Sequence, residues 1–98
     1  MKLSIIYAPS AHITANAIYE SILNKFGLTA ANKFVAKTEK TIELIAVNPL
    51  MFKATVIDET VRVALITKQC SLFYHVSDTS IQLLYFWDNR QDPQFDQY

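Results

Sequence analysis

The sequence predicts an α+β fold: an N-terminal strand, a two-helix hairpin and then a three-stranded antiparallel meander, with all the strands in one sheet. Two features predict it. Apolar residues recur with a helical period up to Asn48-Pro49 and with a period of two beyond it. The residue before a proline also disfavours the helical conformation, so the change of period coincides with a helix end. A chain of 98 residues builds one core of ordinary size, and we expect a single domain over residues 1–98.

The first half of the chain predicts a strand followed by a helix. The segment of residues 2–8 is short and rich in Ile and Leu, and it ends at Pro9. These features are typical of a strand. Ser10 is expected to cap the helix, and Gly27, the only glycine, to end it in a left-handed conformation, with Leu28 folding back onto the last turn. The apolar side of this helix repeats every three or four residues: Ala11, Ala15, Ile18, Ile22 and Phe26.

A second helix is expected from Thr29, as its cap, to Asn48. Lys33, Lys37 and Lys40 are spaced so that they share one exposed face. The simpler interpretation is a solvated face, and the alternative is a contact with phosphate or a partner. The predicted buried side is Phe34, Val35, Ile42 and Ile45.

The second half predicts strands at residues 52–57, 61–67, 70–76 and 80–87. Both faces of the last two strands are apolar, and two helices cover only one face of such a sheet. The other face therefore curls over a small core of its own or meets another protein. Alternation predicts one face with Leu72, Tyr74, Ile81, Leu83, Tyr85 and Trp87, and the other with Phe73, Leu84 and Phe86.

Charge and composition exclude several classes of function. The formal net charge is zero, with six lysines against three acids in residues 1–53 and three cations against six acids in residues 54–98. Any nucleic-acid surface must therefore be local. A single glycine leaves no phosphate-cradling loop. No apolar run reaches the roughly 18 residues of a membrane span, and we expect a cytoplasmic protein with no membrane partner.

Metal and thiol chemistry are not expected. Cys70 is the only cysteine, so it forms no disulfide within the chain, and we predict a buried structural thiol. His12 and His75 lack the spacing of zinc ligands. His75 also lies five residues after Cys70 in the same strand, so its side chain is expected on the opposite face. We therefore expect no metal, no cofactor and no cysteine nucleophile.

Three cations in the second half are the candidate chemical groups. Arg62 and Lys68 have the same parity in one strand, and Arg90 follows the last strand. Converging cations of this kind stabilise the negative charge that develops at a phosphate without a metal, and Tyr74 or Tyr98 is a candidate proton donor.

A simpler interpretation of the same cations is structural. Arg62 and Lys68 would then be edge charges that keep the sheet soluble. Arg90 lies between Asp88 and Asp92, and it would form a local ion pair or act as an anchor for a partner.

Three segments together resemble the RelE/ParE superfamily of toxin–antitoxin toxins: RVALITK at residues 62–68, SLFY at residues 71–74, and FWDNRQDP at residues 86–93. Family members have an arginine early in one strand, an aromatic segment in the next, and an arginine followed by Asp-Pro-like residues after the last. The similarity in element order covers nearly the whole chain. It implies a small bacterial toxin that a cognate antitoxin neutralises in a hetero-oligomer. RelE-like members cut messenger RNA on the ribosome with basic residues and a tyrosine, whereas ParE-like members inhibit DNA gyrase.

Two positions depart from the RelE-like pattern. Arg62 and Arg90 match its basic residues, but Ala64 and Ser71 stand where a nuclease is expected to carry Lys and Arg. Tyr98 also lies further from Arg90 than the terminal tyrosine of that pattern. Loss of two cations removes several kcal/mol of transition-state stabilisation if each contributes about 2.7–4 kcal/mol.

We therefore predict a ParE-like toxin that acts by binding DNA gyrase rather than as an enzyme, with Phe86, Trp87 and Arg90 as partner contacts. One alternative is a ribosome-dependent, metal-independent endoribonuclease, for which the resemblance and the charges indicate Arg62, Lys68, Tyr74 and Arg90 as catalytic residues. The other alternative is a toxin-like module that has lost its activity and only binds its antitoxin.

Overall fold

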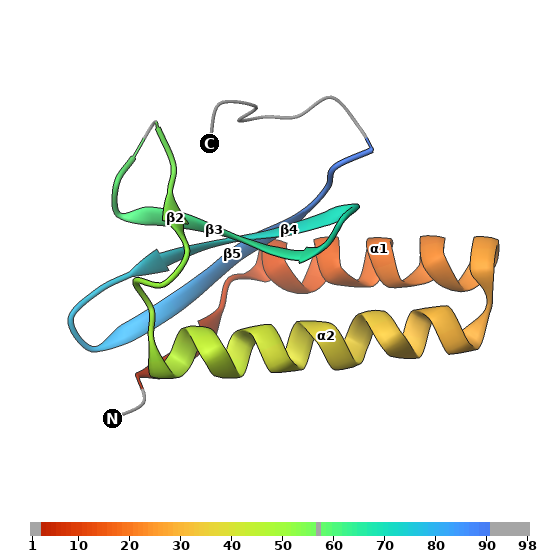
Figure 1. Cartoon of the computed structure of the whole chain (residues 1–98), viewed down its shortest axis with the longest axis horizontal. Coiled ribbons are helices and arrows are strands. Elements are labelled where there is room, and N and C mark those ends of the chain that lie inside the picture. Colours follow the sequence, from red (N-terminus) through yellow and green to blue (C-terminus); the bar gives the residue numbers. More distant parts are fainter. Residues whose placement is uncertain (1–2, 57, 91–98) are drawn as a thin grey trace.

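The computed structural model of the chain describes residues 3–56 and 58–90. Two helices form a hairpin that lies along one face of a sheet (Figure 1). The elements follow in this order: β1 (Ser4–Tyr7), α1 (Pro9–Phe26), α2 (Leu28–Val47), β2 (Lys53–Ala54), β3 (Val61–Thr67), β4 (Cys70–Val76) and β5 (Ser80–Asp88). The predicted α+β fold, with an N-terminal strand, a helical hairpin and a meander, is confirmed.

The sheet has five strands in the order β1-β5-β4-β3-β2. Strands β3, β4 and β5 form the predicted antiparallel meander, and β1 pairs with β5 in parallel. A parallel pair needs a long crossover connection, which the helical hairpin is part of. Of the strand predicted over residues 52–57, the described residues 52–56 form only the two residues of β2, and residue 57 lies outside the described residues.

Gly27 alone joins the two helices. Its φ of +92° is in the range that favours glycine, and its N–H donates to the carbonyl of Leu23 as α1 ends. The same residue is the N-cap of α2, so Thr29 lies inside that helix and not at its cap. Leu28 does not fold back, since it is 60% exposed. Ser10 is likewise inside α1, with Ala8 as the cap residue.

The core lies between the hairpin and the facing side of the sheet. Ala11, Phe34 and Ile45 from the helices are buried there. Two expected members are not: Val35 is 37% exposed and Phe26 is 65% exposed. Val35 lies one residue from Phe34, and one residue turns a helix by about 100°. Phe26 ends α1 where the hairpin extends beyond the ends of the strands (Figure 1).

A β-bulge in β5 reverses the expected alternation. Phe73 pairs with Tyr85 and Tyr74 pairs with Leu83, which leaves Leu84 as the extra residue. Residues after the bulge therefore change faces. The expectation that Tyr85 and Trp87 share a face with Leu83 is wrong, and it is Phe86 that joins the core on the helical side.

Hydroxyl groups of α1 satisfy the backbone around this bulge. The Ser10 hydroxyl donates to the carbonyl of Leu84, and the backbone N–H of Phe86 donates to Thr14 Oγ1 at 2.8 Å. The Ser10 hydroxyl thus hydrogen bonds to a strand and does not cap the helix. These bonds also fix the first turns of α1 to the sheet.

Neither helix in the described part of the chain is long and apolar enough to span a membrane.

Candidate functional site

The predicted site residues lie at two different ends of the sheet. Arg62 pairs with Tyr74 near the start of β3, whereas Lys68 follows the end of β3. The pairing of Cys70 with Asp88 brings that end of β3 beside the end of β5 and so near Arg90. Six residues of extended strand, at about 3.3 Å each, separate Arg62 from Lys68 by about 20 Å. The four candidate catalytic residues therefore form two groups.

At the first end, Arg62 and Tyr74 hold the loop that follows α2. The Nη1 of Arg62 donates to the carbonyl of Phe52 at 2.7 Å and, at 3.5 Å, to that of Leu50. The Tyr74 hydroxyl donates to the carbonyl of Pro49 at 2.9 Å. The Phe52 and Tyr74 rings meet edge to face, with centroids 6.5 Å apart. We call Arg62, Tyr74 and residues 49–52 the loop clamp.

The loop clamp is a poor setting for acid–base chemistry. Burial raises the pKa of Tyr74 to about 12, although the nearby Arg62 charge acts in the opposite direction. The Tyr74 side chain is fully buried, and its proton already lies in a hydrogen bond to a carbonyl. Both residues are thus engaged by the fold.

Ala64 and Ser71, where a nuclease is expected to carry cations, are both fully buried. Ala64 belongs to the core cluster beneath the helices. The Ser71 hydroxyl exchanges hydrogen bonds with the Asn89 side chain at 2.9 and 3.1 Å. A lysine or arginine at either position would have to enter packed structure.

At the second end of the sheet, Arg90 forms an ion pair with Asp88. Its Nη2 lies 2.6 Å from Asp88 Oδ2, and its Nε donates to Asp88 Oδ1 at 2.9 Å. These hydrogen bonds hold the pKa of Asp88 below its usual value, with a smaller contribution from Lys25, and they raise the pKa of Arg90. The structural interpretation of Arg90 as a local ion pair is confirmed for Asp88. Asp92 and Tyr98 lie outside the described residues.

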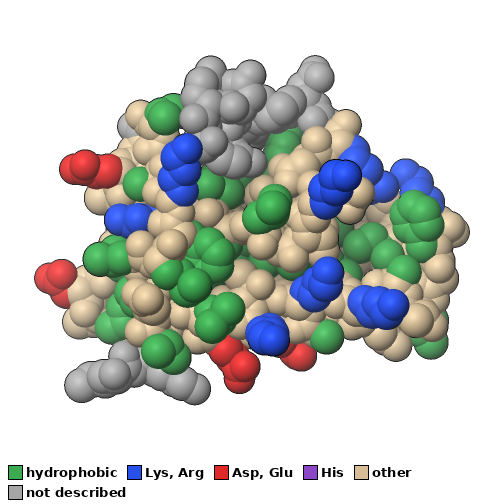
Figure 2. Space-filling model, viewed as in Figure 1, with side chains coloured by type: hydrophobic (Ala, Val, Ile, Leu, Met, Phe, Trp, Pro, Cys, Tyr) green, Lys and Arg blue, Asp and Glu red, His purple; other side chains and the backbone are tan. Residues whose placement is uncertain are grey.

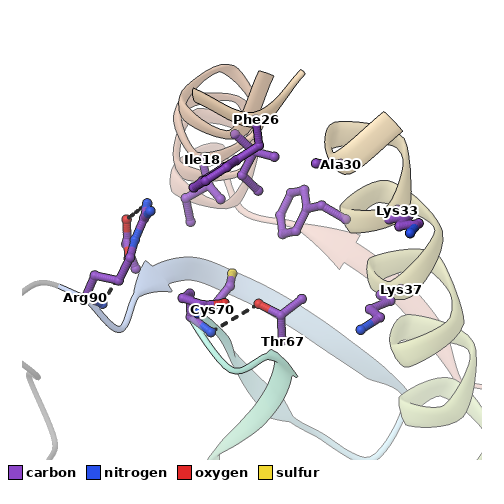
Figure 3. A pocket seen from close by; sticks show the side chains of 12 residues that line it. Ile18, Phe26, Ala30, Lys33, Lys37, Thr67, Cys70 and Arg90 are labelled. Carbon is purple, nitrogen blue, oxygen red and sulfur yellow. Dashed lines mark hydrogen bonds and ion pairs between the residues drawn. The ribbon is translucent and has the colours of Figure 1, made fainter. Parts of the chain in front are cut away.

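An open cleft lies beside this ion pair, between the helical hairpin and the strand ends (Figure 3). Its volume is about 420 Å³. We call it the hairpin cleft. Its apolar lining includes Ile18, Ile22, Phe26 and Phe34, and its cations are Lys33, Lys37 and Arg90.

Cys70 lies at the base of the hairpin cleft, with its sulfur directed toward the helices (Figure 3). Burial, and to a lesser extent the charge of Asp88, raises the pKa of this thiol to about 12. The thiol is therefore protonated at neutral pH, which removes the thiolate that a nucleophile needs. The predicted buried thiol is confirmed.

The expected partner contacts near the end of β5 differ in exposure. Phe86 is only 3% exposed, and its ring meets that of Phe34 edge to face at 6.4 Å. It is a core residue, which corrects its expected place on a contact surface. Trp87 is half-buried, and its buried Nε1 has no hydrogen-bond partner among the described residues. Arg90 remains exposed beside its Asp88 partner.

Sequence reasoning did not find the hairpin cleft. Lys33 and Lys37 were expected on a solvated face, and their spacing does place them on one side of α2. Their position opposite Arg90 depends on how the hairpin packs on the sheet, which no local pattern encodes. Among the described residues, no group of three or more His, Cys, Asp or Glu side chains is placed to hold a metal.

Solved structures of toxins share this fold. A protein described as the chromosomal ParDE toxin–antitoxin system of P. aeruginosa superposes with a TM-score of 0.74 at 18% identity, covering 89% of this chain and 96% of that one. The E. coli DinJ–YafQ toxin–antitoxin complex gives a TM-score of 0.65 at 11% identity, covering 92% and 96%. The YoeB dimer of Staphylococcus aureus gives 0.59 at 18% identity, covering 87% and 94%.

The sequence itself matches a family. No curated protein matches the chain at a significant level. The family model described as the ParE toxin of the type II toxin–antitoxin system parDE matches residues 5–93, which is nearly the whole chain. The chain therefore belongs to the ParE toxin family, within the RelE/ParE superfamily of type II toxin–antitoxin toxins.

Proposed function

We propose that this toxin stops growth by binding DNA gyrase and not by cutting RNA. The observation that carries the proposal is the separation of the candidate nuclease residues. Arg62 and Tyr74 lie at one end of the sheet, and Lys68 and Arg90 lie at the other, about 20 Å away along β3. Electrostatic stabilisation of a reacting phosphate needs donors within about 3 Å of the developing charge, so these four residues do not act on one phosphate together.

The contacts of the individual residues support the same proposal. The Arg62 and Tyr74 hydrogen bonds are made to loop carbonyls, and the Arg90 guanidinium is held by Asp88. Ala64 and Ser71 add no charge. Only Lys68, in the turn after β3, is an exposed cation of the predicted set with no ion pair in the described residues.

The net charge also favours a protein target. A nuclease that finds RNA by electrostatic steering gains from a positive surface, and this chain carries nine basic and nine acidic residues. In the view of Figure 2, most of the basic side chains lie over α2 and the neighbouring strand ends toward the turn between the helices, and others lie at the opposite end, where acidic side chains also lie. Such a local patch suits a protein contact better than a long nucleic acid.

We further propose that a cognate antitoxin neutralises the toxin in a cytoplasmic hetero-oligomer. The family is defined by the parDE toxin–antitoxin system, and two of the similar structures are described as toxin–antitoxin assemblies. A small protein encoded beside this chain's gene would be the candidate antitoxin.

Controlled expression and two purified assays test the proposal. Expression of the chain alone is expected to arrest growth and to induce a DNA-damage response, and co-expression of the neighbouring protein is expected to relieve both. Purified toxin is expected to inhibit supercoiling by gyrase. Unchanged supercoiling at a large excess of toxin would contradict the gyrase target.

Primer extension on translated messages tests the alternative function, cleavage of messenger RNA. New 5′ ends that depend on the toxin and on ribosomes would establish the endoribonuclease. Harmless expression with retained binding of the neighbouring protein would instead indicate an inactive binding module.

A further inference from the structure

A second cavity lies between the two helices, beside the end of β1. Its volume is about 230 Å³, which is below the range of about 300–1,000 Å³ typical of pockets for whole small molecules. We call it the interhelical notch. Two buried rings, Phe34 and Phe86, line its base, and Tyr7, Tyr19 and Glu39 are among the residues around its opening. A notch of this size suits one large side chain of a partner.

Tyr7 forms an aromatic wall of the interhelical notch. Its ring stacks on that of His12, with centroids 4.8 Å apart and planes 16° apart. Its backbone is fixed by the pairing of β1 with β5, in which Tyr7 lies opposite Leu83. The Tyr7 side chain is still 43% exposed, and a second phenol, that of Tyr19, lines the notch from α1. The notch therefore presents aromatic surface that the fold has already positioned.

Glu39 is the only charged side chain among the described residues that line the notch. It is exposed and forms no ion pair within the described residues. No lysine or arginine stands three or four residues from it in α2, where a partner within the helix would lie. Burial and, to a lesser extent, the charge of Glu39 raise the pKa of Tyr7, so the carboxylate and the phenol lie near each other. One uncompensated negative charge thus remains beside aromatic rings.

The hairpin cleft lies on the other side of α2 and has the opposite charge. Its Lys33 and Lys37 each precede a notch residue, Val35 and Glu39, by two positions. Two residues turn a helix by about 200°, which places the two pairs on nearly opposite sides. The two sites therefore select groups of opposite charge.

We propose that the interhelical notch binds an arginine side chain on the surface of DNA gyrase. The aliphatic part of that side chain packs against Val35 and Ile42, its guanidinium stacks on Tyr7, and its N–H groups donate to Glu39. The proposal rests on the proposed gyrase function. It adds which surface of the toxin makes the contact and which chemical group that surface recognises.

Other side chains match this combination less well. An acidic group would meet the charge of Glu39, and no cation among the described lining residues would offset the repulsion. An apolar side chain would bury the carboxylate without a partner, which costs free energy. A lysine pairs as a point charge, whereas a guanidinium both stacks on an aromatic face and forms two parallel hydrogen bonds with a carboxylate.

A DNA-binding enzyme supplies such side chains at its surface. Proteins that hold DNA neutralise its phosphates with lysine and arginine, so the DNA-facing surface of gyrase is expected to be basic. An acid among aromatic rings is complementary in charge to such a surface, and arginine and aromatic residues are enriched at the centres of protein interfaces. Glu39 also repels phosphate, which opposes binding of a free nucleic acid at the notch.

A charge reversal tests the ionic part of the proposal. Glu39→Lys places a cation in the notch, and Glu43→Lys makes the same change one helical turn further along α2, at an exposed residue that does not line the notch. Binding to purified gyrase is measured at about 0.15 M salt, where distant surface charges are screened. Glu39→Lys is expected to bind at least about tenfold more weakly than the wild type, and Glu43→Lys within about threefold. Both should melt near the wild-type temperature because both side chains are exposed.

Two changes at Tyr7 test the aromatic part. Tyr7→Phe keeps the ring and should bind gyrase within about threefold of the wild type, whereas Tyr7→Leu removes the aromatic face and should bind about fivefold to tenfold more weakly. Ile6→Ala is the control for a change in β1, because Ile6 is 49% exposed and its side chain points to the opposite face of the strand. It should leave the affinity within about threefold.

The outcomes separate this proposal from the one on which it rests. Failure of the wild-type toxin to bind gyrase or to inhibit supercoiling would contradict the proposed function. Wild-type affinity in Glu39→Lys would overturn the notch as the contact while leaving gyrase as the target.

The candidate antitoxin serves as a second probe. Glu39→Lys and Tyr7→Leu should both bind it within about threefold of the wild type. Loss of that binding with unchanged gyrase affinity would overturn the proposal in favour of an antitoxin contact. Restored binding of Glu39→Lys when one gyrase arginine is changed to glutamate would support the proposal and identify the opposing residue.

Discussion

The two ends of the sheet use charged and polar side chains in opposite ways. At the loop clamp, the Arg62 guanidinium and the Tyr74 hydroxyl reach carbonyl oxygens of the loop at residues 49–52. At the hairpin cleft, Lys33 and Lys37 have no ion-pair partner within the described residues. A polar group that the fold has satisfied contributes to stability, whereas one left in an open cleft is available to a partner.

This difference also bears on the choice of target. The family pattern places basic residues and a tyrosine where a nuclease would use them, and the sequence alone cannot distinguish a catalytic arginine from a structural one. The contacts of Arg62 and Tyr74 make the structural role the stronger interpretation. Variants at the two ends are therefore expected to fall into separate groups, with stability lost at the loop clamp and binding lost at the cleft.

The largest effect is expected at Tyr74. Tyr74→Ala removes a fully buried ring and should lower the free energy of unfolding by about 3–5 kcal/mol, as other aromatic truncations in cores do. Tyr74→Phe keeps the ring and loses only the bond to Pro49, so about 0.5–1.5 kcal/mol is expected. Urea denaturation measures both. A loss below about 1 kcal/mol for Tyr74→Ala would mean that the loop clamp does not stabilise the fold.

The reactivity of Cys70 tests whether the base of the cleft is packed as part of the core. Its pKa of about 12 predicts that the folded protein reacts with iodoacetamide at pH 8 roughly a thousandfold more slowly than the urea-unfolded chain, since the thiolate fraction falls tenfold per pH unit. A pKa raised by folding contributes stability below the unfolded value, near 9, and loses it as pH rises toward 12. Equal reaction rates for the folded and unfolded chains would show that the cleft opens to its base.

A Cys70→Ala variant is the control for the pH dependence. It should retain part of the alkaline loss of stability, because folding raises the pKa of Tyr74 in the same direction. The wild type should lose more stability than this variant between pH 9 and 12. An identical slope in the two proteins would contradict the shift assigned to Cys70.

A substitution at Arg62 tests whether the role of this arginine is structural or catalytic. Arg62→Met keeps the length of the side chain but removes the donors to the Phe52 and Leu50 carbonyls, so a loss of about 1–3 kcal/mol in the free energy of unfolding is expected. Lys68→Met, at an exposed turn, should change stability by less than about 0.5 kcal/mol.

Growth arrest by these two variants gives the functional comparison. A binding toxin should lose activity only as far as its folded fraction falls, and at low temperature Arg62→Met should still arrest growth. Complete loss of activity in a folded Arg62→Met protein would instead make Arg62 a functional residue and remove the distinction between the two ends of the sheet.

Patterns in the sequence predicted most of the fold. The helical period up to Asn48 and the alternation after it located both helices and the three strands of the meander, and Gly27 fell at the one described position with positive φ. Rules based on local sequence failed where contacts between distant parts of the chain determine the structure. Ser10 hydrogen bonds to Leu84, 74 residues away, and the bulge at Leu84 moves Phe86 into the core. Neither contact leaves a periodic signal.

The candidate site was predicted less well, for a physical reason. Alternation placed Arg62 and Lys68 on one face of a strand, but a shared face does not bring residues together when six positions separate them. The hairpin cleft was missed because its lining comes from both helices and from two strand ends. A resemblance to the family located the chemically interesting segments without showing which of their side chains the fold engages.

The smallest effect is expected at the Asp88–Arg90 pair. Asp88→Asn should cost at most about 1 kcal/mol at pH 7, because Arg90 is exposed to solvent and Asp88 is only half-buried, so that solvent screens the pair. The pKa of Asp88 is lowered by folding, so its contribution is present above the unfolded value, near 4, and is lost as pH falls through the folded one. The stability difference between wild type and Asp88→Asn should therefore shrink as pH falls below the unfolded pKa, while Asp78→Asn, at an exposed turn, should show a smaller difference at pH 7. A cost above about 2 kcal/mol would mean that this ion pair holds the end of β5 as firmly as Arg62 holds its loop, and the charged groups at the cleft end would then stabilise the fold as much as those of the loop clamp do.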